Sequence, residues 1–123
     1  MSASCSHPVV IYQSFDKPGG WGPICGTSEA TPMLAGVIAL ADQVAGHPLG
    51  PINPFLYQMA AARDPGIVDV TRGNNTVRLD QGGHTVTVHG FKAMRGYDLA
   101  SGVGTINARW FVRELAALAA KRP

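Results

Sequence analysis

Apolar residues recur along the chain in runs that fit both helices and short strands. The strongest apolar run is Met33–Ala41, and it continues to Ala45 with polar residues only near its end. A helix that is apolar on all faces is normally buried, so this segment predicts a core helix. Thr27 is a suitable N-cap for it, and Gly46 is a suitable stop.

Two shorter helices are predicted downstream. The first covers residues 53–63 and has Pro54 in its opening turn, where the missing N–H costs nothing. The second covers residues 108–121, with Asn107 as its cap. Its apolar stripe consists of Trp110, Phe111, Leu115 and Leu118.

Strands are predicted where β-branched and aromatic residues cluster or alternate with polar ones. Four segments qualify: a buried strand over Val9–Phe15, a short strand over Ile67–Val70, and a hairpin of Thr76–Asp80 with His84–His89. The stretches 18–23 and 90–105 are rich in glycine and predict loops. Because strands alternate with long helices, we expect an α/β fold whose parallel strands are covered by helices.

Composition narrows the functional classes. The 123 residues suffice for one domain, and 46% are apolar, enough for a buried core. Ten basic and eight acidic residues give a net charge of +2 without a basic cluster, so neither a nucleic-acid surface nor a membrane surface is indicated. The longest apolar stretch, Met33–Ala41, is too short to cross a bilayer. Cys5 and Cys25 could pair, but two thiols leave both the pairing and the compartment open.

The segment that begins at Gly26 carries the clearest chemical signal. Glycine permits a sharp turn before the helix, and Ser28 then lies in the first helical turn. Free backbone N–H groups at that position can stabilise an oxyanion. Pro32 cannot donate to the Ser28 carbonyl, which leaves the backbone near the serine slightly open. A serine in such a place can also be no more than a helix cap.

Ser28 is followed by Pro32 at four residues and by Gly36 at eight. This pattern resembles the nucleophile helix that subtilisins and sedolisins share, and the resemblance implies that Ser28 is the nucleophile. There are two departures. Glu29 stands where small or apolar residues are usual, although it points about 100° around the helix from Ser28, and Cys25 stands where glycine is common.

Three further segments resemble sedolisins and occur in the order of that family: Ile52–Tyr57, Asp69–Asn75 and Gly96–Asn107. The resemblance covers essentially the whole chain from Val9 to the C-terminus. The resemblance implies that residues 1–123 are the C-terminal portion of a sedolisin-type catalytic domain. It also implies a partial subtilisin-like three-layer fold with a C-terminal calcium-binding loop region.

The same resemblance implies one structural calcium ion. Its ligands are the side chains of Asp69 and Asp98 and the backbone carbonyls of Val70, Met94 and Gly96. A set made only of oxygen atoms suits a hard cation, and without a soft ligand neither zinc nor copper is indicated. We expect the ion to clamp two glycine-rich loops. The alternative is that both aspartates are ordinary turn residues.

Much of a sedolisin's catalytic machinery has no counterpart in this sequence. The family activates its serine with a glutamate oriented by an aspartate four residues later, and a further aspartate serves the oxyanion hole. Only 27 residues precede Ser28, Asp16 is the one upstream carboxylate, and no two acids are four residues apart. Without a base the hydroxyl stays protonated, so we expect no appreciable peptidase activity from the isolated chain.

Three functional hypotheses follow. In the first, the chain is part of a serine endopeptidase that hydrolyses peptide or protein substrates by acyl transfer once its N-terminal Glu/Asp part completes it. The resemblance implies an acidic working pH and a secreted or lysosome-like setting for that parent. In the second, it is an inactive calcium-binding or interaction module. In the third, it is a subtilisin fragment whose missing base is histidine and which has no calcium at Asp69 and Asp98.

Overall fold

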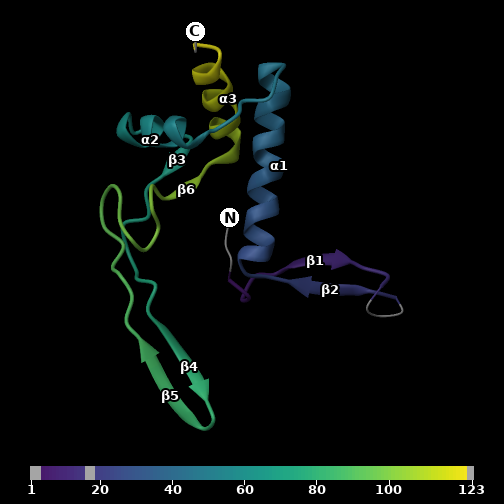
Figure 1. Ribbon diagram of the computed structural model, residues 1–123, viewed down its shortest axis with the longest axis vertical. Helices are drawn as coiled ribbons and strands as arrows, with labels where there is room; N and C mark the ends of the chain where they lie inside the picture. The colour runs from purple at the N-terminus through teal and green to yellow at the C-terminus, as the bar shows by residue number, and fades with distance from the viewer. Residues whose placement is uncertain (1–3, 16–18, 122–123) are drawn as a thin grey trace.

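The protein is described here by a computed structural model that covers residues 4–15 and 19–121. Three helices combine with three pairs of short strands (Figure 1). The helices are α1 (Thr27–Ala45), α2 (Asn53–Ala61) and α3 (Ala108–Ala119). The strands are β1 (Val9–Tyr12), β2 (Trp21–Ile24), β3 (Ile67–Val68), β4 (Val77–Gln81), β5 (His84–Val88) and β6 (Thr105–Ile106). None of the described helices is both long and apolar enough to cross a membrane.

The hydrophobic core lies where the three helices meet. α3 runs beside the C-terminal half of α1, and α2 closes the cluster together with β3 and β6 (Figure 1). Phe111 and Leu115 on α3 and Met59 on α2 are the largest side chains that are fully buried. Ala41 is the small residue of α1 against which they pack. The predicted apolar stripe of α3 is therefore confirmed in its central residues.

α1 is less buried than its sequence predicts. Its apolar residues at Met33, Leu40 and Val44 are all exposed, Leu40 to 54%. The prediction of a helix buried all round was wrong for the described structure, because α3 covers only the face that carries Val37 and Ala41. The uncovered face is therefore apolar surface.

The prediction of parallel strands was wrong for the described residues, since all three two-stranded sheets are antiparallel. Parallel neighbours need a crossover of a dozen or more residues, usually a helix. Only eight residues separate β1 from β2, and two separate β4 from β5. The segment that connects β3 to β6 is long but contains no helix, and the two strands pair antiparallel. The broader prediction of a mixed α/β chain is confirmed.

The sequence predicted one of the two hairpins in full and the other only in part. β4 and β5 pair from Val77↔Val88 to Gln81↔His84, as their alternation predicts. The first hairpin was missed in part, because Trp21–Ile24 has the glycine and proline of a loop yet forms β2. β1 was expected to be buried, but most of it is exposed, with Tyr12 stacked edge-on against Trp21 at 5.3 Å between ring centroids.

Glycine at position 66 allows α2 and α3 to approach. A Cβ atom there would lie 2.7 Å from the Met59 Cε and 2.9 Å from the Phe111 Cα. The Gly66 carbonyl also accepts a hydrogen bond from the Asn107 N–H at 3.0 Å, which fixes the start of α3. Asn107 occupies the predicted N-cap position, but its side chain makes no capping bond.

Candidate functional site

The serine helix begins one residue earlier than predicted. Gly26 is the N-cap, with φ 86° and ψ −170°, a conformation open essentially to glycine alone. Its carbonyl accepts hydrogen bonds from the N–H groups of Glu29 and Ala30 at 3.1 and 3.2 Å. The N–H groups of Thr27 and Ser28 precede this intrahelical ladder and remain available to a ligand. Ser28 is exposed in the first turn, as the oxyanion hypothesis requires.

Glu29 follows Ser28 in the same turn and points about 100° around the helix from it. Only 6% of it is exposed, and its Oε2 is buried without a partner among the described residues. Ser28 and Glu29 therefore differ in burial, which agrees with the expected angle between them. No described hydrogen bond joins the Glu29 carboxylate to Ser28. Asp16, the other carboxylate near the serine in sequence, lies outside the described residues.

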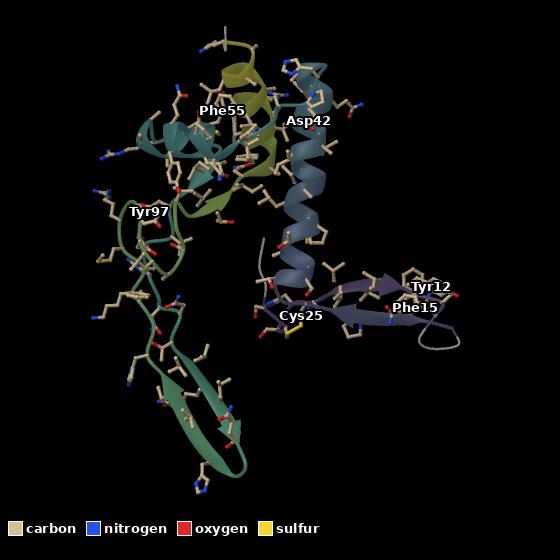
Figure 2. All side chains as sticks on the ribbon, in the orientation of Figure 1. Tyr12, Phe15, Cys25, Asp42, Phe55 and Tyr97 are labelled. Atoms are coloured by element: carbon tan, nitrogen blue, oxygen red, sulfur yellow. A yellow bond between two sulfur atoms is a disulfide. The ribbon has the colours of Figure 1, made fainter. Side chains whose placement is uncertain are left out.

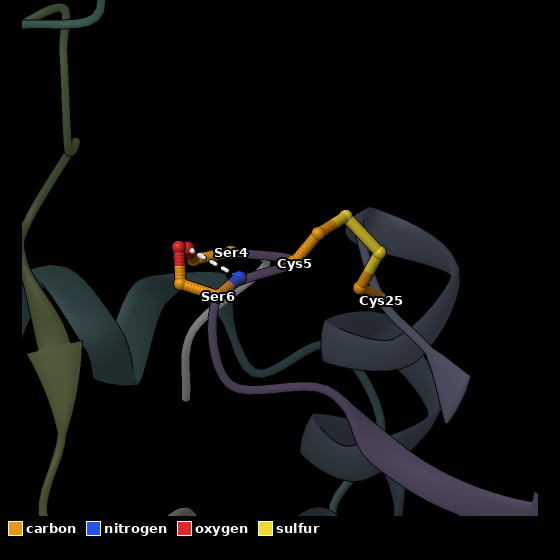
Figure 3. The surroundings of a disulfide bond; sticks show 4 residues. All are labelled: Ser4, Cys5, Ser6 and Cys25. Atoms are coloured by element: carbon orange, nitrogen blue, oxygen red, sulfur yellow. Dashed lines mark hydrogen bonds between the residues drawn. A yellow bond between two sulfur atoms is a disulfide. The ribbon is translucent and has the colours of Figure 1, made fainter.

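A disulfide between Cys5 and Cys25 ties the N-terminal segment to the residue that precedes Gly26 (Figure 3). The bond closes a loop that contains the whole β1–β2 hairpin. Figure 2 shows Cys25 at the base of α1, where the serine turn begins. The open question of pairing is therefore answered, and the bond restrains the entry of the chain into the serine helix.

Asp98 organises the second predicted site. Only 4% of it is exposed, and its carboxylate accepts backbone N–H bonds from Met94 at 2.8 Å, Ala100 at 2.8 Å and Ser101 at 2.7 Å. The Ser101 hydroxyl donates to it as well, at 3.1 Å. The Met94 and Ser101 N–H groups hold the pKa of Asp98 below its ordinary value of 3.8, against the opposing effect of desolvation. Asp98 is therefore ionised at neutral pH.

Asp69 reaches the same loop from the end of β3. Its Oδ2 accepts the Gly96 N–H at 2.8 Å, across 27 residues of sequence. The two predicted carboxylates thus hold the same short segment. Asp98 accepts the Met94 N–H, and Asp69 accepts the Gly96 N–H. Val70 directly follows Asp69 and is half-buried. The structure therefore brings the five predicted ligand residues into one neighbourhood.

Sequence reasoning did not assign a role to Ser101 or Gly104. Ser101 stands three residues after Asp98, and this spacing is typical of a side-chain-capped turn. A Cβ atom at Gly104, whose φ is +105°, would collide with the carbonyl oxygen of Val68 and lie 3.1 Å from the Asp69 Cα. Glycine at this position is therefore what lets the two loops approach.

The oxygen ligands of the predicted calcium site suit a hard cation only in part. Asp69 uses one oxygen for one hydrogen bond, so most of its lone pairs remain open. Most of the lone pairs of the Asp98 carboxylate already accept N–H hydrogen bonds. The described residues contain no cluster of three or more His, Cys, Asp or Glu side chains, but the predicted set needs only two carboxylates. Met94 does not have a positive φ, so the usual glycine is not required there.

A cavity of about 730 Å³ lies between the C-terminal end of α2 and these loops, with Asp69 and Gly96 in its wall. Tyr97, in the loop beside α2 in Figure 2, also lines it. Arg63 and Arg95 contribute positive charge to the same wall. The wall of the cavity therefore carries one carboxylate and two guanidinium groups.

Comparison with known proteins identifies relatives of this chain by sequence. No family model matches the chain, and no solved structure matches it either. Tripeptidyl-peptidase 1 of Homo sapiens is 39% identical over 68% of the chain, and that of Dictyostelium discoideum is 32% identical over 87%. Tripeptidyl-peptidase sed5 of Aspergillus fumigatus is 34% identical over 87%. These relatives are sedolisin-family peptidases. The chain belongs to the sedolisin family.

Membership of the sedolisin family confirms the resemblance based on the four motifs and removes the subtilisin alternative. The aligned regions make up 15%, 16% and 18% of the lengths of these three relatives. The chain therefore corresponds to a small part of a sedolisin peptidase.

Proposed function

We propose that this chain supplies the nucleophile and a structural calcium site to a serine-type peptidase that cleaves peptide bonds by acyl transfer. Ser28 is the nucleophile, and the N–H groups of the first turn of α1 help to bind the oxyanion. The observation that carries the proposal is the exposed Ser28 at the start of a 19-residue helix, immediately after a glycine-only turn. The first helical turn directs its free N–H groups and the positive end of the helix toward a developing negative charge.

The proposed reaction needs a base that the described residues do not offer. Glu29 is buried, and no described hydrogen bond joins Ser28 to a carboxylate or an imidazole. A serine without a base is a weak nucleophile. The Glu/Asp part of a sedolisin catalytic domain is therefore the proposed partner, and the isolated chain should not hydrolyse peptides. The exposed apolar face of α1 is a suitable surface for that part.

A chimera tests the role of Ser28. The chain replaces the aligned segment of human tripeptidyl-peptidase 1, and peptide hydrolysis is measured at acidic pH. We expect activity that Ser28→Ala lowers by at least about 10³-fold. Thr27→Ala is the matched control, because Thr27 is an exposed hydroxyl residue of the same turn, and it should retain most of the activity. If a folded chimera is inactive, or if Ser28→Ala keeps its activity, the proposed nucleophile is wrong.

The calcium ion is the second part of the proposal. The side chains of Asp69 and Asp98 and the carbonyls of Val70, Met94 and Gly96 are the proposed ligands. What supports the site is the convergence of both aspartates on residues 94–96. When bound, the ion would neutralise the two carboxylates and hold the loops together.

Calcium titration by calorimetry tests the site in the isolated chain. Asp69→Asn should abolish binding, because Asp69 is the carboxylate with free lone pairs. Asp80→Asn, in the distant β4–β5 hairpin, is the control and should bind normally. Absence of calcium binding by a folded wild-type chain would mean that hydrogen bonds alone hold the loops. Calcium binding together with an inactive chimera would favour the non-catalytic module.

A further inference from the structure

The β4–β5 hairpin has an exposed apolar face and an unpaired edge. It projects away from the helices (Figure 1), and among the described residues β4 pairs only with β5. Val77, Leu79, Val86 and Val88 are each 44–50% exposed. Their register, Val77↔Val88 and Leu79↔Val86, puts all four on one face. An isolated two-stranded hairpin is at best marginally stable, whereas three or more strands with an apolar face can be stable, so the free edge favours an added strand.

The turn determines which backbone groups lie on the free edge of β4. Gly82 and Gly83 both have positive φ, +58° and +82°, which is the two-residue type I′ loop. Such a loop closes on the hydrogen-bonded pair Gln81↔His84, and pairs alternate from there. Leu79 therefore bonds inward to β5. The N–H and C=O groups of Arg78 and Asp80 point outward.

The free edge of β4 is complementary to itself. If two copies pair antiparallel with Leu79 on the two-fold axis, Arg78 of each copy lies opposite Asp80 of the other. These are the residues whose backbone groups point outward, so two hydrogen-bonded pairs form around the axis. Each of them joins opposite charges. On β5, the backbone groups that point outward in this alternation belong to Thr85 and Thr87. Both residues are uncharged, so the edge of β5 offers no pairing of opposite charges.

We infer that the edge of β4 binds a second copy of this chain, giving a symmetric four-stranded sheet in the order β5-β4-β4-β5. The two apolar faces then form one continuous surface with Leu79 against its symmetry mate. Two short strands bury little area, so the association is weak and depends on concentration. The proposal is independent of peptidase activity, because it uses no residue of the serine or calcium sites.

A charge swap tests the pairing in the full chain. Arg78→Asp and Asp80→Arg each place like charges opposite one another, and each should weaken dimerisation on the order of tenfold in sedimentation equilibrium. The double variant Arg78→Asp/Asp80→Arg restores opposite charges and should recover the wild-type association. It also keeps the same two charges within each hairpin. A monomeric wild-type chain at millimolar concentration, or a double variant no better than the single ones, would overturn the inference.

Disulfide trapping provides a second test that does not depend on charge. Leu79 and its symmetry mate form a pair without hydrogen bonds, with Cα atoms roughly 4.5 Å apart, close enough for a disulfide. Leu79→Cys should therefore yield a covalent dimer on mild oxidation. Val77→Cys is the control, since its two copies lie roughly 13 Å apart along the strands, and it should remain monomeric. Equal cross-linking of the two variants would contradict the register.

Discussion

Gly104 holds the two loops of the proposed calcium site at close range, and Gly104→Ala should separate them. The added Cβ would collide with the Val68 carbonyl oxygen and would lie 3.0 Å from the Val68 carbonyl carbon and 3.1 Å from the Asp69 Cα. All three are backbone atoms, so no side chain can rotate to make room. Either β3 or the loop before β6 must move.

Two costs add up in this variant. An L-residue at φ +105° carries backbone strain of about 1–3 kcal/mol. Forcing a methyl group into a packed contact costs about 1–3 kcal/mol more. The sum of about 2–6 kcal/mol is a large part of the roughly 5–15 kcal/mol that separates folded from unfolded small domains. We therefore expect Gly104→Ala to lower the free energy of unfolding by about 3 kcal/mol or more.

Urea unfolding of the disulfide-intact chain measures this loss. Gly102→Ala is the matched control, because Gly102 also has a positive φ, +63°, but a Cβ there meets nothing within 4 Å. The control should lose only about 1 kcal/mol, the cost of the left-handed conformation. If the two variants lose the same stability, the close approach of the loops is not what requires glycine at 104.

Three other variants test separate parts of the structure. Gly66→Ala should destabilise the chain by about 1–3 kcal/mol in urea unfolding, because its methyl group would press on the backbone of Phe111 at 2.9 Å. Arg63→Gly should stabilise it by about 1 kcal/mol in the same assay, since Arg63 has φ 54° in a C-terminal turn where glycine is usual; a loss of stability would mean that the Arg63 side chain contributes more than its strain costs. The Asp98 carboxylate has a lowered pKa in the folded chain, so its stabilising effect is complete above pH 3.8 and is lost as the pH falls through the folded-state value. Asp98→Asn should therefore unfold at lower temperature than wild type at pH 7, with a difference that shrinks in acid; a difference that does not change with pH would contradict this role.

Local patterns predicted the helices and one hairpin well. α1 ends at Ala45 with Gly46 in the left-handed conformation, because a helix end with αL geometry favours glycine. The two glycines at 82 and 83 likewise specified the β4–β5 turn. Pairing partners were harder, since β1–β2 contains a proline and a glycine within β2 that suggest a loop. The burial of α1 depends on what covers each face, which its own sequence does not specify.

For the candidate sites, the sequence predicted which residues take part but not all of the contacts that they make. The motifs placed Ser28 and the two aspartates, and the structure brings Asp69 and Asp98 to the same segment. The role of Asp98 as an acceptor of several N–H groups depends on the fold of residues 94–101, and that arrangement appears only in three dimensions. Gly104 was hidden for the same reason, because the backbone that it approaches lies more than 30 residues away in sequence.

Mapping the acyl group in the chimera tests the central claim most directly. The chimera is mixed with a peptide ester, quenched in acid during turnover, digested and analysed by mass spectrometry. Acyl transfer through the first turn of α1 predicts a single adduct, on the peptide that contains Ser28, and its loss in Ser28→Ala. An adduct on another residue, or turnover without any adduct on that peptide, would contradict the assignment of Ser28 as the nucleophile.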